Sequence, residues 1–89
     1  MPDHLLTFEL AKDGDELLIH ADAAGLRYLA SALTRLAQHS DAGRKEHTHL
    51  MTEDWSGHEL SSVAQGVGDR LLHQVTIHGW PTRGGANVA

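Results

Sequence analysis

Residues 22–39 read DAAGLRYLASALTRLAQH, and this stretch decides the fold class. Asp22 is a predicted N-cap, and the Ser-Asp-Ala-Gly sequence at residues 40–43 ends the pattern. The stretch therefore predicts one helix of about 17 residues, roughly 25 Å long. Leu33 lies at the centre of its apolar stripe and is expected in the core. The apolar positions that recur at helical spacing are Leu26, Leu29, Ala30, Leu33, Leu36 and Ala37.

The segments on either side of this helix alternate with the period of a strand. Residues 5–10 and 16–21 are two such segments, and the Asp13-Gly14 pair between them is typical of a tight hairpin turn. Residues 47–51 predict a short strand and residues 71–80 a longer one. The order is therefore β-β-α-β-β, and we expect an α+β fold, a two-layer arrangement with one antiparallel sheet and one long helix packed on one face. The sheet residues expected beneath the helix are Leu6, Phe8, Leu10, Leu17, Ile19, Val75 and Ile77.

Chain length indicates a single domain. Eighty-nine residues allow one modest core, and we assign that domain to residues 1–81, with a disordered tail over residues 82–89. Residues 52–69 have little periodicity and exceed an ordinary connection, so they are expected to be partly structured or functional.

Composition and charge exclude several functional classes. The net charge of −5 argues against binding of nucleic acid or of an anionic membrane and favours a basic or neutral partner. The absence of cysteine removes disulfides, thiol catalysis and cysteine-ligated zinc. No N-terminal signal sequence or membrane-spanning run is present, and we expect a cytoplasmic protein.

Eight histidines are the main compositional oddity. His47 and His49 lie two apart on a predicted strand, so both side chains leave the same face at a spacing that can chelate a metal ion. A site of His47, His49 and His58 is one alternative, and it would make the protein metal-binding or a metal-dependent enzyme. The sequence lacks the motifs of familiar metallohydrolases, serine hydrolases and phosphate-binding loops. We therefore predict a non-enzymatic protein without a cofactor.

The sheet face opposite the helix is the predicted binding surface. It would carry a mixture of apolar, aromatic and histidine side chains that suits protein association, and Trp55 fits either this interface or the core. A homo-oligomeric structural module, paired through the open sheet or an edge strand, is a further alternative. The side chains expected on this face are Thr7, Glu9, Leu18, His20, Thr76, His78 and Trp80.

A longer motif carries a family resemblance. Residues 47–60 contain His-x-His-Leu-Met-Thr-Glu followed by Trp-x-Gly-x-Glu-Leu, and together with the flanking elements they resemble predicted immunity proteins of bacterial polymorphic toxin systems. The likeness covers residues 5–81. It implies a bacterial, cytosolic, non-enzymatic α+β protein that binds and neutralises a toxin domain. The residues expected to bind are His47, His49, Glu53, Asp54, Trp55, His58, Glu59, His20, His78 and Trp80.

Overall fold

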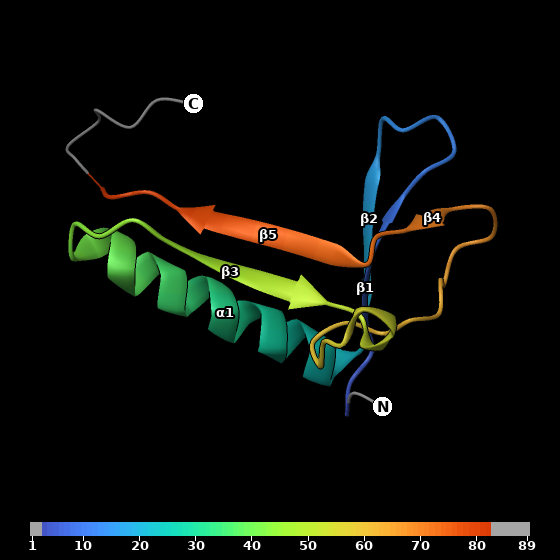
Figure 1. Ribbon diagram of the computed structural model, residues 1–89, viewed down its shortest axis with the longest axis horizontal. Coiled ribbons are helices and arrows are strands. Elements are labelled where there is room, and N and C mark those ends of the chain that lie inside the picture. Colours follow the sequence, from blue (N-terminus) through green and yellow to red (C-terminus); the bar gives the residue numbers. More distant parts are fainter. Residues whose placement is uncertain (1–2, 83–89) are drawn as a thin grey trace.

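The computed structural model describes residues 3–82 and confirms the α+β class and the β-β-α-β-β order (Figure 1). The predicted tail, residues 82–89, lies outside the described residues except for Thr82, whose backbone N–H donates to the carbonyl of Ser40 at 3.0 Å. The elements are β1 (Leu6–Leu10), β2 (Leu17–Ala21), α1 (Ala23–Asp41), β3 (Glu46–Met51), the 3-10 turn η1 (Glu53–Trp55), β4 (Arg70–Leu71) and β5 (Gln74–Gly79).

The strands form two antiparallel sheets, where the sequence predicted one. The first has the order β2-β1-β4 and the second pairs β3 with β5. Figure 1 shows β3 and β5 running alongside α1, whereas the β1–β2 hairpin crosses near the start of the helix. The two-stranded sheet of β3 and β5 is called the ribbon below.

The division between the sheets falls inside the predicted strand 71–80. Leu71 belongs to β4 and pairs with Glu9 of β1. The backbone N–H of Leu72 then donates to the carbonyl of Phe8 at 2.9 Å, and the carbonyl of His73 accepts from the N–H of Thr52 at 2.9 Å. Because adjacent residues are bonded to different sheets, the chain bends here and continues as β5.

The core lies where the two sheets and the helix meet. It contains Leu6, Phe8, Leu50 and Leu60, and the half-buried hydrophobic residues that pack against it are Ala21, Leu29, Leu72, Val75 and Ile77. The predicted core positions Leu6, Phe8, Val75 and Ile77 are thus confirmed. The core residue Leu60 comes from the long loop, where no periodicity could indicate burial.

The prediction for Leu33 was wrong, because this side chain is 46% exposed. The buried residues of helix α1 are Gly25, Ala32 and Leu36. The apolar stripe on the helix is therefore wider than the surface that packs against the strands. Leu17 and Ile19 of β2 were also expected beneath the helix, and both are exposed. β2 is an edge strand, and covers one side of the core only in part.

The N-terminus of α1 begins as predicted. Asp22 is the N-cap, and its Oδ1 accepts from the backbone N–H of Gly25 at 2.8 Å and of Leu5 at 3.1 Å. One carboxylate therefore caps the helix and fixes the chain that enters β1. The hydrogen bond from Gly25, followed by the one from Leu5, holds the pKa of Asp22 below its ordinary value.

The loop after β3 is partly structured, as expected. Gly57 is buried, and a side chain there would collide with the backbone of Met51. Its N–H donates to the carbonyl of Thr52 at 2.8 Å, which closes the turn that contains η1. Gly57 therefore lets the loop fold back against the end of β3.

Candidate functional site

The ribbon presents a histidine-rich face to the outside. Leu50 is buried in the core, so its strand neighbours His49 and Met51 point to the opposite side. The register pairs His47 with His78 and His49 with Thr76 across the two strands. The outer ribbon face, as this surface is called below, comprises Lys45, His47, His49, Met51, Gln74, Thr76, His78 and Trp80.

Three histidines meet near the middle of the outer ribbon face. The ring centroid of His47 lies 4.9 Å from that of His49 and 5.5 Å from that of His78. The Gln74 amide donates to Nδ1 of His49 at 3.2 Å, and the Thr76 hydroxyl lies 2.9 Å from the same nitrogen. Gln74 and Thr76 thus hold the ring of His49 in place on this face.

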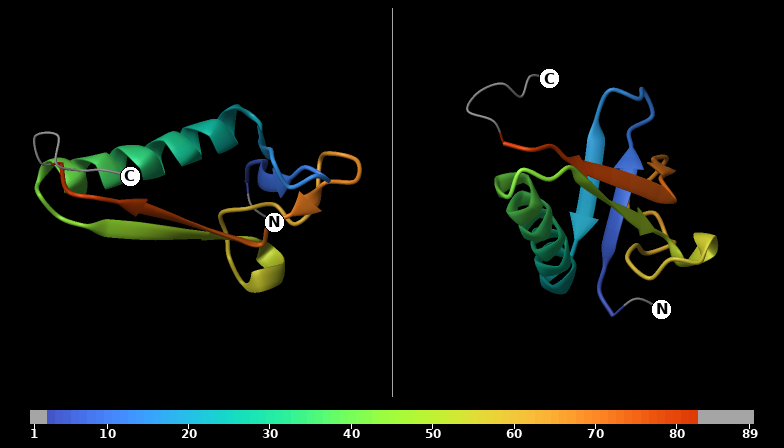
Figure 2. Two further views of the ribbon diagram at one scale, coloured as in Figure 1. Left: turned by 90° about the horizontal axis from the view of Figure 1, so that it is seen from above. Right: turned by 60° about the vertical axis from the view of Figure 1, so that its left-hand side comes forward.

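Two exposed tryptophans lie near the ribbon, Trp80 on the outer ribbon face and Trp55 in η1 beyond the end of β3. Trp80 is 59% exposed, and Nζ of Lys45 lies 4.1 Å from its ring centroid. Trp55 is 54% exposed and stacks on His73 with centroids 5.2 Å apart and planes 9° apart. In the left view of Figure 2, η1 lies beyond the end of β3, and the ring of His73 that supports Trp55 is itself bonded through Nδ1 to the hydroxyl of Thr52 at 2.8 Å. Both indole rings are thus supported from one side and open to solvent.

The structure brings together only part of the predicted site. His47, His49, His78 and Trp80 share one face. Glu59 turns inward instead, and its Oε1 accepts from the N–H of Met51 at 2.9 Å. That carboxylate therefore holds the loop.

The remaining predicted residues of the loop lie around η1. Asp54 and His58 are exposed, and the N–H of Asp54 donates to Oγ of Ser62 at 3.1 Å. Glu53 is half-buried beside a hollow between the N-terminal segment and residues 61–65. The residues lining this hollow are His4, Leu5, Glu53, Ser61, Ser62, Val63 and Gln65.

His20 was expected near His78 and Trp80, but it lies in the other sheet. Its partner across the strands is Thr7 of β1. The prediction that this sheet face is open was also wrong for Thr7 and Glu9, which are both 0% exposed. Residues 65 and 66 of the long loop cover them, since the backbone N–H groups of Gln65 and Gly66 donate to Glu9.

Glu9 is a buried carboxylate that sequence patterning placed on a solvated face. Its Oε2 accepts from the hydroxyl of Thr7 at 2.6 Å and from the N–H of Gln65 at 2.9 Å, and its Oε1 accepts from the N–H of Gly66 at 3.0 Å. Burial raises the pKa of Glu9, but these three hydrogen bonds and the nearby His20 outweigh it and hold the pKa below its ordinary value. Glu9 is buried because residues 65 and 66 of the loop fold over it and donate hydrogen bonds to its carboxylate.

One cluster of potential metal ligands lies within the described residues. In residues 3–82, the group of side chains whose ligand atoms all lie within 4.8 Å of one another is Glu9, His20 and Asp69. His58 does not complete such a group with His47 and His49. His47 and His49 leave the same strand face, as predicted, and metal binding by His47, His49 and His58 stays an alternative prediction.

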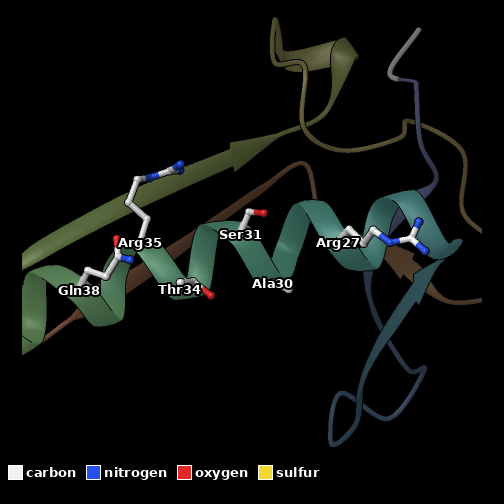
Figure 3. A pocket seen from close by; sticks show the side chains of 6 residues that line it. All are labelled: Arg27, Ala30, Ser31, Thr34, Arg35 and Gln38. Carbon is white, nitrogen blue, oxygen red and sulfur yellow. The ribbon is translucent and has the colours of Figure 1, made fainter.

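A shallow depression on α1 offers no comparable chemistry. Figure 3 shows its lining side chains along the outer side of this one helix. They include two arginines and polar residues of a solvated helix face, and the complete set is Arg27, Ala30, Ser31, Thr34, Arg35 and Gln38.

Within residues 3–82, no helix has the length and apolar character that crossing a bilayer requires.

Comparison with known proteins identifies the family. Neither the curated proteins nor the solved structures contain a significant match to the chain. The sequence model of the family described as Immunity protein 32 matches residues 16–71, which include β2, α1, β3 and the loop as far as β4. Because this match spans more than half of the chain, the protein belongs to the Immunity protein 32 family.

Proposed function

We propose that this protein binds a bacterial toxin domain in the cytoplasm and neutralises it, and that the outer ribbon face makes the contact. Membership of an immunity protein family supports the toxin-neutralising role. The observation that carries the choice of surface is the exposed Trp80 on the histidine-rich face, with a second exposed tryptophan, Trp55, in η1 just beyond the end of β3.

The chemistry of this face suits binding. Tryptophan is enriched among the few residues that dominate the energy of protein interfaces, and it works best where neighbouring contacts exclude water. Lys45 and His73 each support one indole ring, so less rotamer freedom is lost when a partner docks. The histidines, Gln74 and Thr76 between them offer hydrogen-bond donors and acceptors. We therefore propose that the two tryptophans anchor the partner and that the histidine-rich face gives the specificity.

The charge of the chain indicates the character of the toxin surface. A net charge of −5 attracts a basic partner over a distance and raises the association rate. Asp54 stands exposed in η1, next to Trp55 and beyond the end of β3. We propose that it helps to steer a basic toxin domain to this end.

Co-expression in a sensitive bacterium tests the function. The toxin domain would be taken from the gene beside that of this chain and expressed alone, with the wild-type chain, and with the Trp55→Ala/Trp80→Ala double variant. We expect the wild-type chain to restore growth and the double variant to lose protection. Leu33→Ala is the matched control, because Leu33 is an exposed apolar residue of α1 outside the outer ribbon face.

Three outcomes would contradict the proposal. The wild-type chain could fail to protect although it is folded and expressed, or the double variant could protect as well as the wild type. The third is turnover of a small molecule that His49→Ala abolishes, which would favour the enzyme alternative. Light scattering of the purified chain would show whether a second copy covers the same face instead of a toxin.

A further inference from the structure

We propose that Glu9, His20 and Asp69 form a binding site for one zinc ion, separate from the outer ribbon face. The three residues come from β1, from β2 and from the segment just before β4. Their ligand atoms all lie within 4.8 Å of one another. Glu9 is buried and the other two are half-buried, so this is not an exposed acidic patch.

Glu9 is held rigidly in this cluster. Its Oε2 accepts two hydrogen bonds, from Thr7 and Gln65, whereas its Oε1 accepts one, from Gly66. A carboxylate oxygen has two lone pairs, so Oε1 keeps one lone pair for a cation. Partners that orient a ligating carboxylate in this way are typical of protein metal sites.

Asp69 approaches the same place because residue 66 is glycine. A Cβ at Gly66 would collide with Oδ2 of Asp69 and lie 3.3 Å from Oε1 of Glu9. The missing side chain therefore lets two carboxylates converge. Two carboxylates at this separation repel each other in a partly buried place, and a divalent cation between them would replace that repulsion with attraction.

His20 supplies the third donor and a second, independent observation. Its Nε2 is buried and, in the described part of the chain, has no hydrogen-bond partner. Buried polar nitrogens are rarely left unpaired, because the lost hydration is costly. A neutral imidazole nitrogen is a preferred zinc ligand, and coordination would satisfy an atom for which the protein provides no partner.

The donor set favours zinc over magnesium or calcium. Zinc accepts imidazole nitrogen together with carboxylate oxygen at about 2.0–2.2 Å, which places the ligand atoms of a tetrahedral site roughly 3.4 Å apart. Small movements of His20 and Asp69 toward the fixed Glu9 would reach this geometry. Magnesium and calcium prefer six or more oxygen ligands, and this cluster offers fewer. Bound zinc would tie the β1–β2 hairpin to residues 65–69.

Calorimetric titration with zinc chloride tests the site after chelator treatment and dialysis. The background is the His47→Ala/His49→Ala/His78→Ala variant, since those exposed histidines could bind zinc themselves. We expect one zinc ion per chain, and at least tenfold weaker binding in Asp69→Asn and in His20→Ala. Asp15→Asn, a change of an exposed aspartate in the hairpin turn, is the control and should bind as the background does.

Circular dichroism would confirm that each variant is folded, and Asp69→Asn preserves the shape of the side chain. Magnesium chloride in place of zinc chloride should give no binding at the same concentrations. The proposal is overturned if the background variant binds no zinc, or if Asp69→Asn and His20→Ala bind it as tightly as the control. The titration needs no toxin, so its outcome is independent of the proposed immunity function.

Discussion

The buried carboxylate of Glu9 accepts a hydrogen bond from the backbone N–H of Gly66, 57 residues later in the chain. With the bond from Gln65, it fastens the long loop over β1. The loop that contributes Leu60 to the core is thus held at a second place by one ionised side chain.

Glu9→Gln should therefore destabilise the fold. A glutamine keeps one acceptor oxygen but turns an NH₂ group toward a donor, so at least one buried donor loses its partner. We expect a loss of about 1–3 kcal/mol in the free energy of unfolding, measured by urea denaturation. Glu16→Gln changes an exposed glutamate of the hairpin and should leave the free energy of unfolding within about 0.5 kcal/mol of the wild type. If the two changes lowered the free energy of unfolding equally, Glu9 would not be the residue that fastens the loop over β1.

Stability should also fall in acid. The folded-state pKa of Glu9 lies below the ordinary 4.5, so its contribution is complete above the unfolded-state pKa and is lost as the pH falls through the folded-state value. Asp22, lowered from 3.8, acts in the same direction. Urea midpoints between pH 7 and pH 3 should decline more steeply for the wild type than for Glu9→Gln. Parallel curves would show that Glu9 does not carry the acid sensitivity.

Removing the helix cap should have a moderate effect. Asp22→Ala leaves the N–H groups of Gly25 and Leu5 without their shared acceptor, and we expect a lower unfolding temperature because the first turn of α1 loses its cap. Thermal unfolding at pH 7 measures it. Asp22→Asn should recover most of the loss, since asparagine also caps well. A cap role is refuted if Asp22→Ala unfolds at the wild-type temperature.

Two leucines should respond very differently to truncation. Leu60 is 0% exposed in the core, and Leu60→Ala should cost about 2–5 kcal/mol. Leu33 is 46% exposed, and Leu33→Ala should cost less than about 1 kcal/mol because little buried surface is lost and alanine favours the helix. Denaturant midpoints measured in parallel decide between them. The reverse order would mean that α1 is rotated relative to its described position.

The sequence predicted the elements better than their assembly. Helical spacing located α1, and Asp22 marked its start, because both signals are local. Helical spacing also indicated burial of Leu33, but the width of the surface beneath a helix depends on the strands that pair there. A two-stranded ribbon is narrower than the predicted sheet, so one side of the stripe is exposed.

In the candidate site too, local patterns were predicted correctly and the assembly of the strands was not. Strand periodicity placed His47 and His49 on one face, and it placed His78 and Trp80 together across the opposing strand. It could not separate His20 from them, since alternation does not state which sheet a strand joins. The burial of Glu9 depends on backbone N–H groups of a loop distant in sequence, and no local pattern encodes that contact.

The affinity of the purified complex tests the central claim most directly, that the outer ribbon face binds the toxin. Dissociation constants would be measured by calorimetry for the wild type, Trp55→Ala, Trp80→Ala and the control Leu33→Ala. We predict that each tryptophan variant binds about 30-fold more weakly, which corresponds to about 2 kcal/mol, while Leu33→Ala binds as the wild type does. Unchanged affinity in both tryptophan variants, or weaker binding in Leu33→Ala alone, would contradict the account.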